Sequence, residues 1–315
     1  MKKVVVIGGG TGSYMVLRGL KKYPLDITAV VSAFDSGGSS GILRDEFGVL
    51  PPGDVRRCLV ALSDEKKENM LRDLFGFRFK KESSLQGHNL GNLLLTALSE
   101  IKGGEVAAIQ TAGELLDIKG RVFPVSKTRA QLCARLMNGR KIIGEKNIDV
   151  PKHNGNLKIE RVYLKPRATL LKEAREAMAE ADVVVIGPGD LYTSLIPNFL
   201  VGGMRRVCQK SNATFVYILN VMTKWGETNN FSASDFPREI LRYLGRPTFD
   251  YILANNKRLK PSLLAKYRKE KSMPVVIDEH LSLYTKRIIQ APLIHQSDII
   301  RHESDALARI LSTII

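Results

Sequence analysis

The chain opens with a run of β-branched residues, Val4–Ile7, that leads directly into the glycine-rich segment Gly8–Gly12. A short apolar run of this kind is typical of a strand that is buried on both faces of a parallel sheet. Ile27–Val31 has the same pattern, and the residues between the two runs have apolar positions at helical spacing, with four expected to be buried: Met15, Val16, Leu17 and Leu20. This order of strand, loop, helix and strand predicts the first unit of a doubly wound sheet.

The rest of the chain continues the alternation of strands and helices. Further strands are expected at residues 182–186, 214–219, 249–254 and 275–277, and further helices at residues 55–62, 64–81, 93–101 and 170–181. Between about residues 113 and 165, Asn138-Gly139 and Asn154-Gly155 offer the positive φ angles of tight hairpin turns. We therefore expect one Rossmann-like, three-layer α/β domain over residues 1–315, with a doubly wound, mostly parallel sheet and a small antiparallel hairpin insertion at about 113–165.

The composition is that of a globular protein with a strong positive charge. Of the 315 residues 44% are hydrophobic and 25% charged, and the formal net charge is +16. Residues 119–175 hold 15 Lys and Arg against 4 Asp and Glu, which is +11 of that charge. Such an excess favours anionic partners: nucleotides, nucleic acids or acidic membrane surfaces. A solvated, lysine-rich surface is the simpler interpretation, and no sequence-specific nucleic-acid binding is expected, because no interleaved aromatic residues or RNP pattern accompany the charge.

The cysteines and the apolar runs indicate the cellular compartment of the protein. Cys58, Cys133 and Cys208 are scattered and lack C-x-x-C spacing, which argues against a disulfide framework and a zinc site. The apolar run at the N-terminus is too short for a signal peptide, and no stretch has the length of a membrane span. We therefore expect a cytoplasmic protein without a membrane span.

Gly8–Gly12 has the properties of an anion-binding loop. Glycine lets backbone N–H groups approach an anion without interference from a Cβ, and the following helix adds partial positive charge at its N-terminus. Gly8 and Gly10 match the start of the dinucleotide-binding fingerprint G-x-G-x-x-G, but Ser13 stands at the third glycine position. The motif is weak by itself, and a tight turn without a ligand is the alternative.

Three other loops also follow predicted strands: Asp35–Gly41, Gly187–Asp190 and Asn220–Thr223. Asp35–Gly41 is so rich in Gly and Ser that it is expected to be a flexible loop rather than regular structure. In an open parallel sheet, ligands bind beside the carboxyl ends of the strands at the switch point. We therefore expect these loops and Gly8–Gly12 to form one binding site.

The residues in and beside these loops and the Pro51–Asp54 turn suit a phosphate-bearing ligand. The hydroxyl donors are Thr11, Ser36, Ser39 and Ser40. Backbone without side chains comes from Gly37, Gly38 and Gly41, and positive charge comes from Arg44, Arg56 and Arg57. Mg²⁺ prefers carboxylates together with phosphate oxygens, so its candidate ligands are Asp35, Asp54 and Asp190. Turn capping is the alternative for each aspartate. His88 is a candidate general acid or base, or a residue that merely bonds the backbone beside a helix N-cap.

Five motifs occur in an order that resembles a known family: Gly8-Gly9-Gly10-Thr11-Gly12, Asp35-Ser36-Gly37-Gly38-Ser39-Ser40-Gly41, Pro51-Pro52-Gly53-Asp54-Val55-Arg56, Gly87-His88-Asn89-Leu90-Gly91-Asn92 and Gly187-Pro188-Gly189-Asp190-Leu191-Tyr192-Thr193-Ser194. Over nearly the whole chain they resemble the 2-phospho-L-lactate transferase (CofD) superfamily. Asn220–Thr223 followed by Gly226-Glu227-Thr228 resembles its YvcK branch, the gluconeogenesis factors. Asp190 departs from that branch, where a small residue such as serine is expected, and this leaves metal-assisted chemistry open.

The resemblance implies two functions of different classes. The transferase branch moves a phospholactyl group from a nucleotide diphosphate donor onto a deazaflavin precursor, with magnesium. The YvcK branch is a cytoplasmic factor for cell shape and growth on gluconeogenic carbon that binds a UDP-linked amino sugar, and it has no established reaction. We expect a homodimeric factor that binds a UDP-N-acetylglucosamine-like ligand, with the magnesium-dependent transferase as the alternative.

The resemblance also implies which residues bind the ligand. Near the C-terminus, Tyr267 and Arg301 resemble the ligand-binding tyrosine and arginine of the YvcK branch, the alternative being a surface tyrosine and a helix-capping arginine. The full expected set is Gly8, Gly9, Gly10, Thr11, Gly12, Asp35, Ser36, Gly37, Gly38, Ser39, Arg44, Asp54, Arg57, His88, Asn92, Gly187, Gly189, Asp190, Thr193, Asn220, Tyr267 and Arg301.

Overall fold

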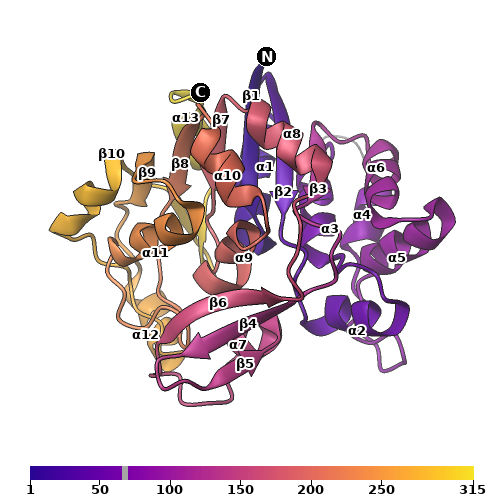
Figure 1. The fold of residues 1–315 in the computed structure, drawn as a ribbon, viewed down its shortest axis with the longest axis horizontal. Coiled ribbons are helices and arrows are strands. Elements are labelled where there is room, and N and C mark those ends of the chain that lie inside the picture. Colours follow the sequence, from indigo (N-terminus) through magenta and orange to yellow (C-terminus); the bar gives the residue numbers. More distant parts are fainter. Residues whose placement is uncertain (66–69) are drawn as a thin grey trace.

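The computed structural model describes residues 1–65 and 70–315, and a seven-stranded parallel sheet lies at its centre (Figure 1). The strand order is β10-β9-β8-β7-β1-β2-β3, and every neighbouring pair runs parallel. The strands are β1 Lys2–Gly8, β2 Leu25–Val31, β3 Arg121–Pro124, β7 Val183–Ile186, β8 Thr214–Ile218, β9 Phe249–Asn255 and β10 Thr285–Ala291. The predicted Rossmann-like α/β class is confirmed.

Alternate residues of β1 pack into two cores, one on each face of the sheet. Val4 and Val6 belong to the first core, with α1 Gly10–Leu20, α3 Gly53–Leu62, α4 Met70–Gly76, α5 Leu90–Lys102, α6 Glu105–Leu115 and α13 Ser304–Ser312. Val5 and Ile7 belong to the second, with α8 Lys172–Glu180, α9 Ile196–Phe199, α10 Met204–Lys210 and α11 Asp235–Leu244. On α1, three of the four expected residues are buried, whereas Met15 is only half-buried. Burial on both faces explains the unbroken apolar run of β1.

A separate antiparallel sheet has the order β5-β4-β6 and consists of β4 Gln131–Leu136, β5 Lys141–Ile143 and β6 Ile159–Lys165. The Asn138-Gly139 turn joins β4 to β5 as predicted, with Gly139 at φ +84°. Asn154-Gly155 forms no hairpin, because β5 and β6 both pair with β4, and α7 Glu145–Asp149 lies between them in the chain. The antiparallel part therefore covers residues 131–165, since β3 belongs to the main sheet.

Several other sequence-based expectations need correction. Asp35–Gly41 is not all loop, because α2 Gly38–Phe47 begins inside it. Residues 275–277 form no strand; Pro274 makes a single bridge to Met222, and the last strand of the main sheet is β10. Within the helix expected at 64–81, α4 is the helix observed, and residues 66–69 lie outside the described residues.

β10 was not predicted because Lys286, Arg287 and Gln290 surround its two isoleucines, as befits the edge strand of a sheet. Several elements of the second half of the chain were also not predicted, among them α12 Pro261–Lys269, β11 Ile294–Gln296, β12 Ile300–His302 and the short helices η1 Leu191–Leu195 (π-helix) and η2 Glu279–Tyr284 (3₁₀-helix). All three cysteines are free and buried. No helix within the described ranges is long and apolar enough to cross a membrane.

Candidate functional site

A cavity of about 460 Å³ lies at the carboxyl ends of β1, β2 and β7. The chain passes from β1 to β2 on one side and later returns to β7 on the other, so this is the switch point at which open parallel sheets bind ligands. We call it the central cavity. It is lined by Gly9, Gly10, Thr11, Gly12, Ser32, Asp35, Gly37, Gly38, Ser39, Ser40, Gly53, Asp54, Arg56, Arg57, Arg78, Asn92, Glu145, Lys146, Asp149, Gly189, Asp190, Thr193 and Ser194.

The glycine loop at the start of α1 forms the floor of the cavity. Gly10 has φ +67°, a left-handed conformation that favours glycine. A Cβ on Gly12 would lie 1.8 Å from the carbonyl oxygen of Pro188, so only glycine allows the loops after β1 and β7 to meet here. The N-cap residue Gly9 has no side chain to cap α1, and the helix's first N–H, that of Gly10, is bonded to the Asp54 carboxylate. The other free N–H groups of the α1 N-terminus and its partial positive charge are therefore available to an anion.

Two more helices begin at the same cavity. α2 starts after Gly37 and α3 after Pro52, and no side-chain hydrogen bond caps either N-terminus. By contrast, the side chain of Asn89 caps α5 by accepting a hydrogen bond from the Asn92 N–H. The central cavity thus combines three helix N-termini that their own N-cap residues leave uncapped, each of which favours negative charge.

Asp54, in the first turn of α3, faces the glycine loop. Its carboxylate accepts a hydrogen bond from the backbone N–H of Gly10, and a Cβ on Gly9 would lie 2.4 Å from its Oδ2. Arg57 donates to Asp54 Oδ1 at 3.1 Å. Burial raises the pKa of Asp54 to about 6; Arg57 opposes this shift and Asp35 adds to it. A buried carboxylate with a raised pKa beside a glycine loop is typical of a functional site.

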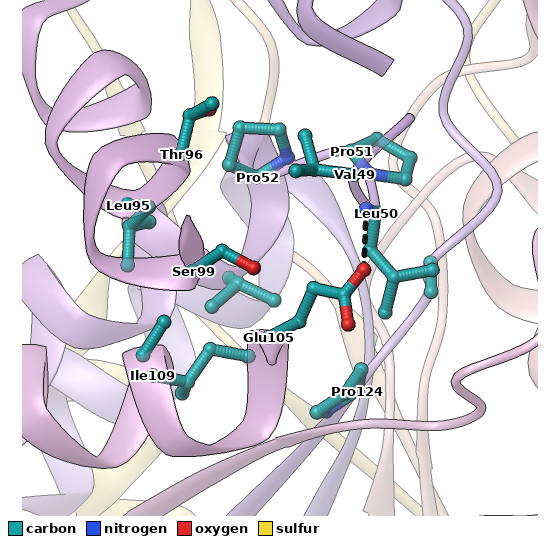
Figure 2. A pocket seen from close by; sticks show the side chains of 13 residues that line it. Val49, Leu50, Pro51, Pro52, Leu95, Thr96, Ser99, Glu105, Ile109 and Pro124 are labelled. Carbon is teal, nitrogen blue, oxygen red and sulfur yellow. Dashed lines mark hydrogen bonds between the residues drawn. The ribbon is translucent and has the colours of Figure 1, made fainter. Parts of the chain in front are cut away.

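A small apolar pocket supports the turn that carries Asp54. Figure 2 shows Pro51 and Pro52 on one side of this pocket, with Leu95 and Ile109 among the residues across it. Glu105 Oε1 accepts a hydrogen bond of 3.4 Å from the Leu50 N–H. Proline rings fix the backbone before α3, and apolar contacts hold them in place. The position of Asp54 is therefore set by packing behind the cavity.

The opposite wall is acidic and centres on one lysine. Lys224 Nζ lies 2.7 Å from Asp190 Oδ2 and 3.2 Å from Glu227 Oε1, and it also bonds Asp149 Oδ1. Glu227 in turn accepts hydrogen bonds from Tyr192 N and Thr193 Oγ1, both at 2.9 Å. Burial disfavours the charge of Lys224, but the three carboxylates together raise its pKa above the ordinary value. The ammonium group ties α7 to the loops after β7 and β8.

The candidate magnesium ligands do not come together as one set. Within the described residues, the group of three carboxylates whose oxygens are close enough to share an ion is Asp149, Asp190 and Glu227, and Lys224 already supplies the positive charge among them. Asp35 instead lies near Asp54.

A third carboxylate, Glu145, lies next to Asp35. Burial and the nearby Asp35 carboxylate raise the pKa of Glu145 to about 8. Because Mg²⁺ uses one or two carboxylates plus phosphate oxygens, the Asp35 and Asp54 pair fits this ion better than Asp190 does.

Most of the predicted residues line the central cavity; eight do not. Gly8 ends β1 and Gly187 follows β7, with Gly187 N donating to Ile7 O, and neither lines the cavity. The Ser36 hydroxyl accepts a hydrogen bond from the Lys146 N–H outside the lining. Arg44 donates to the neighbouring Asp45. His88 is buried behind the lining, with Nδ1 at 3.2 Å from Ser39 Oγ.

The other three belong to the C-terminal half. Asn220 supports the wall from behind by donating to the carbonyl oxygen of Gly189. The Tyr267 hydroxyl, on α12, accepts a hydrogen bond from the Ile300 N–H. Arg301 is exposed on β12, opposite His295. Tyr267 and Arg301 therefore lie outside the lining of the central cavity in this structure.

The two carboxylates of α7, Glu145 and Asp149, and the lysine that Asp149 bonds were not predicted as site residues. Glu145 and Asp149 are two of the four acidic residues in the basic stretch 119–175, at the i, i+4 spacing that places both on one helix face. An acidic pair on one helix face within a basic stretch was the sequence signal that could have identified α7. Lys224 gave no comparable signal, because Asp149 and Asp190 lie 75 and 34 residues away from it in the chain.

The comparisons with known proteins agree with the motifs. Residues 4–294 match the family profile described as 2-phospho-L-lactate transferase CofD. A gluconeogenesis factor of Halalkalibacterium halodurans is 43% identical over 98% of this chain and 95% of its own length, and one of Bacillus subtilis is 39% identical over 98% and 96%. A crystal structure of a Bacillus halodurans protein has a TM-score of 0.92 at 42% identity and covers 99% of both chains. The chain therefore belongs to the CofD family, and within it to the branch of the gluconeogenesis factors.

Proposed function

We propose that the protein is a nucleotide-sugar-binding factor, with UDP-N-acetylglucosamine or a close relative as its ligand. The observation that carries this proposal is the convergence of three uncapped helix N-termini on the central cavity. Backbone N–H groups and helix dipoles of this kind favour phosphate groups. The diphosphate would lie on Gly10–Gly12 beside Arg57, and the volume of about 460 Å³ is in the range of small-molecule sites.

The biological role follows from the family. Relatives that match over nearly their whole length are named gluconeogenesis factors. A nucleotide sugar that feeds cell-wall synthesis would link carbon supply to cell shape, and the proposed role is that of a cytoplasmic, homodimeric factor that responds to this ligand.

A second candidate is a magnesium-dependent transferase with a nucleotide diphosphate donor. It is favoured by Asp35 and Asp54, which lie close together at the glycine loop. A magnesium ion held by these carboxylates would supply Lewis-acid stabilisation of phosphate charge. Arg57 and the α1 N–H groups would orient the phosphates, and Asp54 would hold or release a proton near neutral pH.

Isothermal calorimetry with UDP-N-acetylglucosamine, UDP and NAD tests the binding proposal. We expect micromolar affinity for the UDP-sugar, roughly −8 kcal/mol, with weaker binding of NAD. Absence of heat with every nucleotide would refute the proposal. Incubation with magnesium and candidate donors, followed by product analysis, tests the transferase alternative, because a pure binding factor leaves the nucleotide intact.

A further inference from the structure

Arg56 is a buried cation to which the proposed nucleotide site assigns no role. Its side chain is on α3, one residue before Arg57, and the residue is only 8% exposed. Arg56 Nε donates to Asn92 Oδ1 at 3.0 Å, and a terminal nitrogen donates to the carbonyl oxygen of Phe75 at 3.1 Å. Both partners are neutral. Among the described residues Arg56 makes no ion pair, although it lines the central cavity.

The charge of Arg56 is opposed by its neighbours. Burial and the nearby guanidinium groups of Arg57 and Arg78 together lower the pKa of Arg56 to about 10, and the Asp54 carboxylate offsets only part of this shift. Arg57 has Asp54 as its partner, whereas Arg78 donates to the carbonyl oxygen of Gly87. Burying a charge without a counter-ion costs several kcal/mol. This wall of the cavity therefore has the chemistry of a site for an anion.

The N-terminus of α2 lines the same cavity as Arg56. Asn92 links the two parts, because it accepts from Arg56 through Oδ1 and donates to Ser39 Oγ through Nδ2. The Asp35 carboxylate accepts a hydrogen bond from the Gly37 N–H, while the N–H groups of the next three residues have no acceptor among the described residues. Gly38, the first of these, has φ +46° and open space where a Cβ would stand.

The wall at Arg56 is distinct from the glycine loop. Consecutive residues on a helix point about 100° apart, so Arg56 and Arg57 serve different walls of the cavity. Arg57 lies 3.6 Å from the Cβ position of Gly10, beside α1. Arg56 instead contacts α5 through Asn92 and the end of α4 through Phe75.

We propose that Arg56, Arg78 and the N-terminus of α2 bind a second, phosphate-bearing small molecule beside the nucleotide sugar. Two guanidinium groups and several backbone donors match the oxygens of a phosphate, because guanidinium forks and helix N-termini both recognise this group. The inference rests on the proposed function for the first ligand. It makes the protein a receptor that binds a nucleotide sugar and a phosphorylated metabolite at the same time.

Inorganic phosphate is the probe for this second site. We expect it to bind, at one molecule per chain, to protein saturated with UDP-N-acetylglucosamine in 150 mM salt, as measured by calorimetry. Arg56→Met should weaken this binding at least tenfold, and Arg78→Met, on an exposed side chain that is no threat to folding, should weaken it several-fold. Arg309→Met on the exposed face of α13 removes the same charge and should have no effect.

The result separates this inference from the proposed function. If the UDP-sugar abolishes phosphate binding, the Arg56 wall holds a phosphate of the nucleotide itself and the inference is wrong. Phosphate binding that is equal in wild type and both arginine variants also overturns it. If the UDP-sugar gives no heat but phosphate still binds and depends on Arg56, the proposed function fails while the anion site stands.

Discussion

Arg57 donates a hydrogen bond of 3.1 Å to Asp54, three residues earlier on α3, while the same carboxylate accepts the N–H of Gly10. The carboxylate thus lies where a ligand phosphate would approach the glycine loop. Two anions at one helix N-terminus repel each other unless a proton or a metal ion joins them. This arrangement makes Asp54 sensitive to both pH and magnesium.

Asp54→Asn should stabilise the free protein at neutral pH. The pKa of Asp54 rises from 3.8 to about 6 on folding, so the folded state prefers the protonated form and loses stability as the pH rises through this interval. Asparagine avoids that loss. We expect the free energy of unfolding of the variant to exceed that of wild type by about 1–3 kcal/mol at pH 8, and the difference to disappear below pH 4. Urea unfolding at the two pH values measures it. An equal effect at both values would contradict the assigned pKa.

The same variant separates the roles of Asp54 in binding. If Asp54 holds magnesium, Asp54→Asn should weaken magnesium-dependent nucleotide binding far more than metal-free binding. Asparagine caps a turn nearly as well as aspartate, so a purely structural role predicts little change in either. Titrations with and without magnesium distinguish the two.

Gly10→Val should abolish nucleotide binding while the protein still folds. The φ of +67° at Gly10 is strained for a β-branched residue, and the side chain would approach Arg57 and Ser194 at the phosphate position. We expect at least a hundredfold loss of affinity, about 3 kcal/mol. Gly76→Val is the control, because a Cβ there meets nothing within 4 Å and the φ is not positive. Normal binding by Gly10→Val would exclude this loop as the phosphate site.

Lys224→Met should destabilise the protein, because Asp149, Asp190 and Glu227 then lose their shared cation. Glu227 is buried, whereas Lys224, Asp149 and Asp190 are partly exposed, so the loss should be smaller than the cost of about 3–5 kcal/mol for a fully buried pair. Three carboxylates at this spacing suit a divalent ion, so millimolar Mg²⁺ or Ca²⁺ should restore part of the lost Tm in the variant. Lys286→Met, at an exposed pair with Asp250, should change Tm little. A variant as stable as wild type would show that Lys224 does not hold the cluster together.

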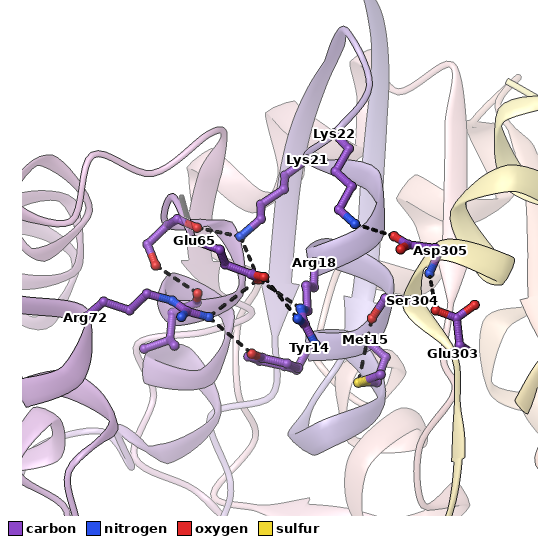
Figure 3. A network of polar contacts seen from close by, with 12 residues as sticks. Tyr14, Met15, Arg18, Lys21, Lys22, Glu65, Arg72, Glu303, Ser304 and Asp305 are labelled. Carbon is purple, nitrogen blue, oxygen red and sulfur yellow. Dashed lines mark hydrogen bonds and ion pairs between the residues drawn. The ribbon is translucent and has the colours of Figure 1, made fainter. Parts of the chain in front are cut away.

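Glu65→Gln should lower stability through a network on the far side of α1 from β1. Figure 3 shows Glu65 with Arg18, Lys21 and Arg72 around it, and Arg18 makes two hydrogen bonds to the carboxylate at 2.9 and 3.0 Å. Burial opposes the charge, but hydrogen bonds from Arg18 and Lys21 outweigh it and lower the pKa of Glu65 to about 2.

The depressed pKa fixes the pH dependence of this effect. The stabilisation is present above the unfolded value of 4.5 and is lost as the pH falls through about 2. We expect a cost of about 1–3 kcal/mol at pH 7, measured by urea unfolding. Glu46→Gln, on an exposed side chain, is the matched control. A difference that persists unchanged at pH 2 would contradict the assignment.

The basic stretch 119–175 should give only weak retention of nucleic acids. Contacts to phosphates alone release counter-ions, so filter binding should fall steeply between 50 and 200 mM salt and should not depend on sequence. Tight binding of one probe at 200 mM salt would show specific recognition and overturn this interpretation.

The local sequence was enough to predict the start of the fold and the glycine loop. Val4–Ile7 is buried on both faces, and Gly10 and Gly12 stand where a positive φ and a close backbone approach require glycine. The positive φ at Gly10 is a local requirement that the glycine pattern carries, whereas the requirement at Gly12 comes from Pro188, far along the chain. The edge strand β10 escaped prediction because an edge position does not demand apolar residues.

The tertiary structure alone decided how the charges of the site are shared. Nothing in the order Arg56-Arg57 says that one guanidinium pairs with Asp54 while the other is buried against Asn92, since this depends on the helices packed around α3. Likewise Asp190 was expected to share an ion with Asp35 and Asp54, yet it bonds Lys224, whose other partners come from α7 and the turn after β8. Charged side chains are long and pair with whichever partner the fold brings within about 4 Å, so sequence shows which charges are present and folding determines their partners.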